Sequence, residues 1–238
     1  MRKTSHILLF LVFTAMVWGC ATRSISNSSY PGDAKSKNPY YSGELNEMDV
    51  LGSVDAKSVS ETDIRQALEN RQEIKLRKGS SIIVIQSGAI KPDEPMIDEL
   101  NKNFITLPFS GTPLKQQDQG SYSKTLRLVA AQGGCTHVLC YWGTLETAVE
   151  DKATKVISWI PVAGVFIPDE SQQMRIRLKA ALIDVASGKW VMLTPDPIDD
   201  SALSSGLGRV KSDQKQVAEL KKKAYATLAS ELFRYFST

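Results

Sequence analysis

The sequence predicts an α/β domain with two layers, in which a mixed β-sheet carries helices mainly on one face. Three observations support this fold class. Helical and strand patterns alternate from residue 60 to residue 148, as in domains that pack helices on a sheet. A hairpin follows at residues 175–195, and its charged residues alternate with apolar ones, which leaves one face of the sheet partly exposed to water. A long amphipathic helix then ends the chain.

The first helix of the domain is predicted over residues 60–79. Ser60 and Asp63 are spaced as in a capping box, and Gly79 provides the stop. The apolar residues between them follow helical spacing: Ile64, Ala67, Leu68 and Ile74. The β-branched run at residues 81–88 then predicts a buried strand.

Two helices and two strands are predicted in the middle of the domain. A short helix begins at Pro95. Residues 104–109 form a strand, which Pro108 confines to a sheet edge or a strand end because proline cannot donate a backbone hydrogen bond. Residues 121–132 form a helix, and residues 136–148 form the third strand.

The last third of the chain predicts a hairpin, a loop and a helix. The hairpin turns at Ser187 and Gly188. The Pro- and Asp-rich residues 194–208 predict a loop, after which Ser212 is expected to cap the final helix. The apolar stripe of that helix contains Val217, Leu220, Ala224, Leu228, Leu232 and Phe236, and its solvated face includes Lys221, Lys222 and Lys223.

Residues 1–19 have the features of a bacterial secretory signal peptide. Arg2 and Lys3 form a positively charged start. Residues 7–18 form an apolar stretch, which is shorter than the roughly 20 residues that a membrane-spanning helix needs. The sequence therefore predicts export from the cytoplasm and removal of this segment.

The residues that end at Cys20 resemble the lipobox, at which bacterial lipoproteins are cleaved and lipidated. Gly19 and Cys20 match the pattern, and Val17 is a tolerated variant. Trp18 departs from the pattern, because this position normally holds a small residue. Ordinary cleavage after Ala21 is the alternative. The resemblance implies that Cys20 is lipidated and that the membrane is reached through this N-terminal lipid.

The lipid anchor would hold the protein at the cell envelope. Each buried acyl CH₂ contributes about 0.8 kcal/mol, so the three chains of a lipoprotein anchor it permanently. Ala21, rather than Asp, follows the cysteine, and in enteric-type sorting this implies the outer membrane, facing the periplasm. We expect the lipidated cysteine and a flexible, Ser- and Asn-rich tether at residues 20–45, and the periplasmic α/β domain at residues 50–238.

The order of elements resembles a periplasmic domain that three groups of proteins share. The features of the resemblance are, in chain order, a helix that ends at Gly133-Gly134, a strand at 136–143 and a hairpin that closes on Asp184 to Gly188. The groups are the amino-terminal domain of the translocation protein TolB, the lipoprotein activators of penicillin-binding proteins, and the curli-secretion lipoprotein. The resemblance covers residues 60–236 and departs at Cys135-Thr136, where such families often have Ala-Asp. It implies a non-enzymatic module for assembly or partner binding, and it transfers no functional residue.

No set of residues suited to catalysis, to metal binding or to a cofactor is recognised. His137 is the one histidine beyond residues 1–19, which excludes a site built from several histidines. Cys135 and Cys140 leave three alternatives open: two buried thiols, a disulfide, or a nucleophile at Cys135 with His137 as its base. Their odd separation points them to opposite faces of a continuous strand, which favours two buried thiols.

Residues 156–168 form an apolar segment without a charged residue. One interpretation is a pair of buried strands that turn at residues 161–164. The other is an exposed loop that meets a partner or the lipid surface through Trp159 and Phe166. A pore hairpin of the curli-secretion type is a third interpretation, although both arms are shorter than the 9–11 residues, roughly, of a membrane strand.

The sequence favours a binding or assembly protein of the envelope over an enzyme. A net charge of +3 with scattered basic residues gives no indication of nucleic-acid binding. We expect an envelope protein as the partner. The alternatives are an envelope hydrolase that uses Cys135 or an unrecognised serine, and a component of a secretion or pore complex.

Overall fold

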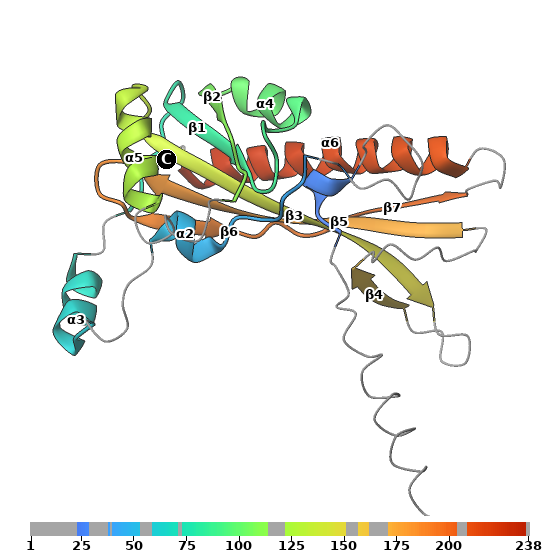
Figure 1. Ribbon diagram of the computed structural model, residues 1–238, viewed down its shortest axis with the longest axis horizontal. Helices are drawn as coiled ribbons and strands as arrows, with labels where there is room; N and C mark the ends of the chain where they lie inside the picture. Colours follow the sequence, from blue (N-terminus) through green and yellow to red (C-terminus); the bar gives the residue numbers. More distant parts are fainter. Residues whose placement is uncertain are drawn as a thin grey trace, which may run out of the picture.

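The computed structural model describes residues 23–28, 38, 40–52, 59–70, 73–113, 122–150, 157–161, 171–203 and 209–236. Within this part of the chain the strands form one mixed sheet of seven strands, and the central order is β2-β1-β3-β5-β6 (Figure 1). Strand β4 pairs with β3, and β7 pairs with β5. The strands are β1 (Ser81–Gln86), β2 (Ile105–Phe109), β3 (His137–Glu150), β4 (Ile157–Pro161), β5 (Ser171–Asp184), β6 (Trp190–Leu193) and β7 (Ile198–Leu203).

The parallel part of the sheet comes from the first half of the domain. Strand β1 pairs in parallel with β2 on one side and with β3 on the other. Its apolar residues are buried, as the β-branched run predicts. Strand β2 pairs with β1 alone in the described chain, which agrees with Pro108 at a sheet edge.

Strands β3 and β5 form the long antiparallel centre of the sheet, and each has different neighbours at its two ends. We call the part made by β1, β2, β6, residues 137–142 of β3 and residues 179–184 of β5 the body. We call the part made by β4, β7, residues 144–150 of β3 and residues 171–177 of β5 the arm.

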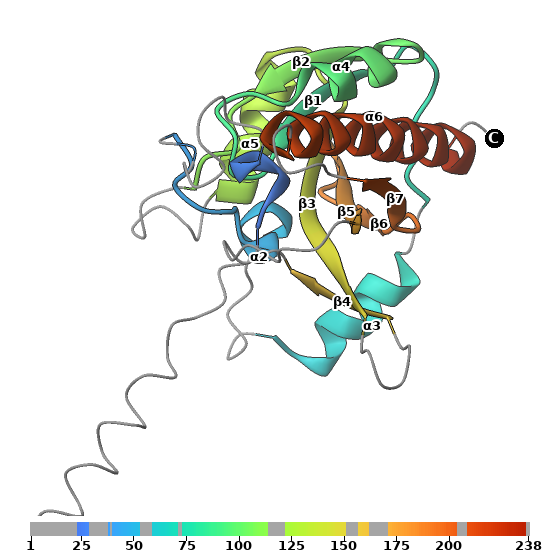
Figure 2. The same ribbon diagram turned by 90° about the vertical axis from the view of Figure 1, so that its right-hand side faces the viewer.

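Helices cover one face of the sheet along its length and the other face only in the body. Helices α4 (Glu94–Asn101) and α6 (Arg209–Phe236) pack on the first face, and Figure 2 shows α6 lying along the sheet. Helices α2 (Glu47–Leu51) and α5 (Tyr122–Gln132) pack on the second face, over the body. The predicted fold class, a mixed sheet with helices mainly on one face and a long C-terminal helix, is therefore confirmed.

Helix α3 (Glu61–Glu69) has the predicted capping box but is shorter than predicted. The Ser60 hydroxyl accepts from the Asp63 amide, and the Asp63 carboxylate accepts from the Ser60 amide. The prediction of a helix up to Gly79 is wrong, because the chain leaves the helix and buries Leu76 in the core instead. All residues of α3 are exposed, so its apolar stripe is not part of the core.

Two predictions for the last third of the chain are also wrong. Residues 198–203, within the predicted loop, form β7 because they extend the sheet beside β5. Helix α6 begins at Arg209 rather than after Ser212. Lys221 is 8% exposed rather than solvated, because its ammonium group forms an ion pair with Asp93.

Part of the segment expected as a tether belongs to the folded domain. The backbone amide of Leu145 donates to the carbonyl of Arg23 at 3.0 Å, and Ser24 forms a β-bridge with Thr144. Ile25, which begins the short 3-10 helix η2 (Ile25–Asn27), is 1% exposed in the main core. The expected flexible tether is thus corrected for residues 23–28, because this segment buries an apolar side chain and pairs with the free edge of β3.

Candidate functional site

The sequence-predicted functional residues fall into two groups. Cys20, Phe166 and the signal peptide at residues 1–19 lie outside the described residues. Trp159 lies on β4, in the arm, where it pairs with Ala148 of β3. Residues 157–161 form a strand, as in the interpretation of a strand pair, but the side chain of Trp159 is half-buried rather than fully buried. The second half of the apolar segment lies outside the described residues.

Trp159 belongs to a ladder of aromatic and charged side chains on the second face of the arm. The guanidinium carbon of Arg175 lies 4.2 Å from the centre of the Trp159 ring, which is a cation–π contact. Glu146 accepts hydrogen bonds from the Nε atoms of both Arg175 and Arg177, the second at 3.2 Å. We call these four residues, Glu146, Trp159, Arg175 and Arg177, the arm face.

The period of the strands explains why these residues meet. Glu146 and Ala148 point to the same side of β3, and their partners in register are Arg175 of β5 and Trp159 of β4. Arg177 exposes 45% of its side chain and Trp159 is half-buried, whereas Arg175 exposes 16% and Glu146 exposes 11%. Arg177 and Trp159 are therefore the members of the arm face that solvent reaches most. The alternation of β5 is visible in the sequence. The role of Glu146 is not, because it depends on the register between β3 and β5.

The two arginines keep Glu146 ionised. Burial by itself raises the pKa of this carboxyl group, but the hydrogen bonds and positive charges of Arg175 and Arg177 outweigh it and hold the pKa below its usual value. The arm face therefore presents a fixed array: one carboxylate, two guanidinium groups and an indole ring. Tryptophan and arginine are enriched at the energetic centres of protein interfaces.

The carboxyl ends of the parallel strands, where ligands bind in many open α/β sheets, hold a network of the chain's own polar side chains. Gln86, at the end of β1, donates from Nε2 to the Ser26 hydroxyl at 3.0 Å. Its Oε1 accepts from the Tyr141 hydroxyl at 2.6 Å and from the Asp93 amide at 2.7 Å. The N-terminal segment thus lies against this end of the sheet.

Asp93 connects that network to α6. One of its carboxylate oxygens accepts from the Lys221 ammonium group at 2.8 Å and from the Tyr225 hydroxyl at 2.6 Å. Lys221 exposes 10% of its side chain and Asp93 exposes 29%, so the pair is largely shielded from water. Its position between α4 and α6 indicates a structural role.

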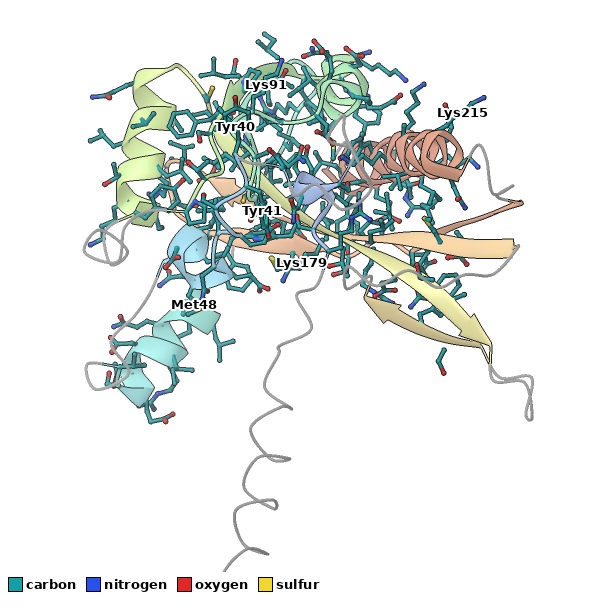
Figure 3. The ribbon with its side chains drawn as sticks, turned by 45° about the vertical axis from the view of Figure 1, so that its right-hand side comes forward. Tyr40, Tyr41, Met48, Lys91, Lys179 and Lys215 are labelled. Carbon is teal, nitrogen blue, oxygen red and sulfur yellow. The ribbon has the colours of Figure 1, made fainter. Side chains whose placement is uncertain are left out.

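A pocket of about 580 Å³ lies beside α2 on the second face, and Figure 3 labels Tyr41, Met48 and Lys179 of its lining. Its lining includes Ser24, Tyr41, Glu44, Trp142 and Lys179. Burial and the nearby Glu44 charge raise the pKa of Tyr41 to about 12. Burial also raises the pKa of Glu44, although its hydrogen bonds with Ser24 and other hydroxyls and the charge of Lys179 offset part of the shift.

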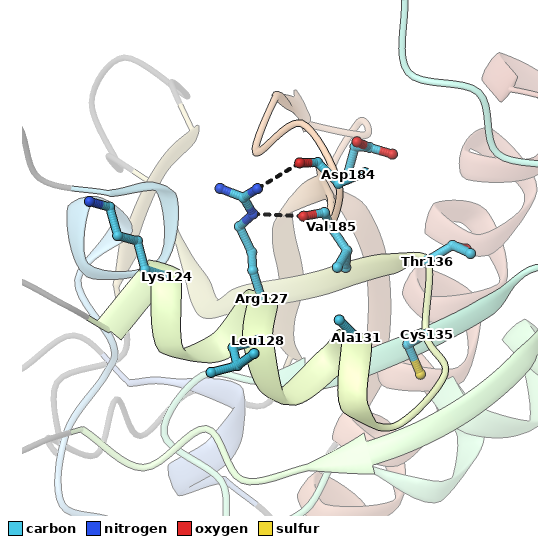
Figure 4. A pocket seen from close by; sticks show the side chains of 9 residues that line it. Lys124, Arg127, Leu128, Ala131, Cys135, Thr136, Asp184 and Val185 are labelled. Carbon is cyan, nitrogen blue, oxygen red and sulfur yellow. Dashed lines mark hydrogen bonds between the residues drawn. The ribbon is translucent and has the colours of Figure 1, made fainter.

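An open groove of about 660 Å³ lies between α5 and the turn after β5 (Figure 4). Arg127 crosses it and donates to the backbone carbonyls of Val185 and Ala186, both at 2.9 Å. Cys135, which lines this groove, carries a thiol whose pKa is raised by burial. The Arg127 guanidinium group thus stabilises the turn after β5.

The structure describes Cys135 and Cys140 and the histidine between them. Cys135 and Cys140 are both buried and are not bonded to each other, which answers the alternative left open by the sequence. Burial raises the pKa of both thiols, and a protonated thiol is a poor nucleophile. The Nδ1 atom of His137 hydrogen-bonds the Thr136 hydroxyl at 2.8 Å, and burial lowers the pKa of its ring.

Among the described residues, no group of three or more His, Cys, Asp and Glu side chains is placed to hold a metal ion. No helix within the same ranges is both long and apolar enough to cross a membrane.

Comparisons with known proteins complete the description of the chain. No curated protein sequence matches it. Among solved structures, the PelC dodecamer from Paraburkholderia phytofirmans is similar at 13% identity and a TM-score of 0.27, with 66% of this chain and 95% of that chain covered. The hypothetical protein CT253 from Chlamydia trachomatis is similar at 12% identity and a TM-score of 0.26, with 64% and 99% covered. At these TM-scores the structures carry no argument about function.

One protein-family model matches most of the chain. The model of the YafT bacterial lipoprotein family matches residues 46–235, which include the helices from α2 onward and all strands described above. This match covers most of the chain, and it agrees with the lipobox-like residues that end at Cys20. The chain belongs to the YafT bacterial lipoprotein family.

Proposed function

We propose that this lipoprotein is anchored in the outer membrane through Cys20, faces the periplasm, and acts as a non-enzymatic binding or assembly module. The arm face carries this proposal. It combines an indole ring and two guanidinium groups on a part of the sheet where Arg177 is 45% exposed and Trp159 is half-buried. We assign the binding of an envelope protein to this surface.

The chemistry of the binding surface suits a protein partner. Arg177 is half-exposed and can form a bidentate contact with a carboxylate of the partner, whereas Arg175 is held over Trp159. Because Glu146 fixes both arginines, less side-chain entropy is lost on binding. The resemblance of the element order to TolB-type periplasmic domains supports an assembly role.

The anchor is tested first. In cells, a palmitate analogue should label the wild-type protein and should not label Cys20→Ser, and the labelled protein should fractionate with outer membranes. Label that is absent from the wild type, or that persists in Cys20→Ser, would contradict lipidation at this residue. Labelled protein in the inner membrane would contradict the localisation alone.

The arm face is tested by photocrosslinking in living cells. A photoreactive phenylalanine derivative at position 159 should give a discrete adduct, and the additional change Arg177→Glu should reduce that adduct at least tenfold. Trp190, which is 50% exposed on β6 in the body, provides the matched control position and should give no such adduct. Equal adducts at both positions, or an adduct that is indifferent to Arg177→Glu, would contradict the proposal.

Covalent probes test the enzymatic alternative. Thiol- and serine-reactive probes should leave the folded protein unlabelled, because Cys135 and Cys140 are buried with raised pKa values. Rapid, stoichiometric labelling of Cys135 or of one serine in the native protein would favour an envelope hydrolase instead.

A further inference from the structure

The N-terminal segment fixes the folded domain close to Cys20. Arg23 and Ser24 are bound to the edge of β3, through the hydrogen bond from Leu145 and the bridge to Thr144. Only two residues separate Cys20 from Arg23 in the sequence. Three Cα–Cα steps of 3.8 Å limit the distance between these two Cα atoms to about 11 Å. The expected tether would instead have spanned about 25–30 Å.

Aromatic, apolar and charged side chains line the pocket beside this attachment point. Ser24 lines the pocket beside α2 together with Tyr41, Met48 and Lys179. Met48 is 53% exposed, and Tyr41 is half-buried. Figure 3 labels Tyr41, Met48 and Lys179, which we call the anchor-side patch.

The anchor-side patch has the chemistry that the boundary of a bilayer accommodates. Tyrosine places an apolar ring and a polar hydroxyl at the level of the headgroups. Lysine buries its aliphatic stem while its ammonium group remains in water. Lys179 is paired with Glu47 and lies 5.4 Å from the centre of the Trp142 ring, so its stem lies along an aromatic surface.

We propose that the anchor-side patch rests on the headgroup surface of the bilayer, so that the lipoprotein is held in one orientation on the membrane. This inference rests on the lipidation of Cys20 proposed above. The occupant of the patch is the lipid surface, because a lipidated Cys20 within about 11 Å of Arg23 brings the bilayer to this side of the domain. Helix α6, on the opposite face of the sheet, then faces the periplasm (Figure 1).

An environment-sensitive fluorophore on the lipidated, full-length protein tests the orientation. The fluorophore is attached through Met48→Cys, or through Lys222→Cys on α6, whose side chain is 61% exposed. Both proteins also carry Cys135→Ala and Cys140→Ala, and both are reconstituted into phosphatidylethanolamine–phosphatidylglycerol vesicles with a quencher on the lipid. We expect at least threefold stronger quenching at position 48 than at position 222. Equal quenching at the two positions would overturn the proposal.

A longer tether provides the second measurement. Twelve Gly and Ser residues inserted between Thr22 and Arg23 leave the folded segment intact and should reduce quenching at position 48 to the level at position 222. Quenching that is unchanged by the insertion would also overturn the proposal. In that case the short connection between Cys20 and Arg23 would not be what holds the patch on the bilayer. Protein that lacks palmitate label and does not float with the vesicles would instead contradict lipidation itself.

Discussion

The body and the arm are built from the same two strands but are covered differently. In the body, β3 and β5 lie between α4 and α6 on one face and α2 and α5 on the other. In the arm, the first face still carries α6 and a buried Ile176, whereas the second face carries Glu146, Trp159 and the two arginines. One half of the sheet therefore has two buried faces, and the other half has one.

The change occurs within a single strand. On the second face of β5, Ile183 and Ala181 lie in the body and are buried. Every second residue from there toward the arm is charged: Lys179, Arg177 and Arg175. If the arm face binds a partner as proposed, stability and recognition are separated along the sheet. Substitutions in the body should mainly cost stability, and substitutions on the arm face should mainly cost binding.

The largest effect is expected in the core of the body. Leu139 is fully buried between the sheet and the helices of the first face. Leu139→Ala should lower the free energy of unfolding by about 2–5 kcal/mol, because it loses transfer free energy and leaves a cavity. Urea denaturation followed by circular dichroism measures this change. A loss below about 1 kcal/mol would contradict the assignment of this residue to a close-packed core.

A smaller loss is expected when the ion pair between α4 and α6 is broken. Asp93→Asn removes the charge that balances Lys221, and because Asp93 is partly exposed we expect a loss of about 1–3 kcal/mol. The matched control is Glu219→Gln. Glu219 forms an exposed ion pair with Lys222, the residue that follows Lys221 on α6. That control should cost at most about 0.5 kcal/mol in the same denaturation experiment. Equal losses would show that burial does not distinguish the two pairs.

The arm should contribute a pH dependence through Glu146. Its pKa is lower in the folded state than in the unfolded state, so its contribution is present above about pH 4.3 and is lost as the pH falls through the folded value. Glu146→Gln should therefore cost about 1 kcal/mol at pH 7 and progressively less below pH 4. Denaturation curves at several pH values measure this difference. A difference between wild type and Glu146→Gln that does not change with pH would contradict the role of its charge.

The smallest effect on stability is expected at Trp159. Trp159→Ala removes a cation–π contact and half-buried area, and we expect a loss of at most about 1 kcal/mol. In a chain of this size that corresponds to a decrease in Tm of about 2–4 °C. The same substitution should abolish association with the partner captured at the arm face. A loss of about 3–5 kcal/mol, as for a core aromatic residue, would place Trp159 in the core and contradict the separation of the two regions.

Local patterns in the sequence determined much of this protein. The charged start, the apolar stretch and Cys20 indicate a lipoprotein, and the family match supports that class. The capping box at Ser60, the buried strand β1 and the turn at Ser187 and Gly188 follow from short-range chemistry, which a sequence displays directly. The charged alternation of β5 likewise predicted that one face of the sheet would be partly wet.

Only the tertiary structure decided which distant residues meet. Glu146 is 29 residues from Arg175, Lys221 is 128 residues from Asp93, and Arg23 pairs with the middle of β3. A strand pattern shows which side chains share a face, but the register between strands selects their partners, and many registers preserve the same alternation. For this reason the sequence places Lys221 in solvent, whereas the structure buries it in an ion pair with Asp93. The sequence likewise places residues 23–28 in a tether, whereas the structure buries Ile25 in the core.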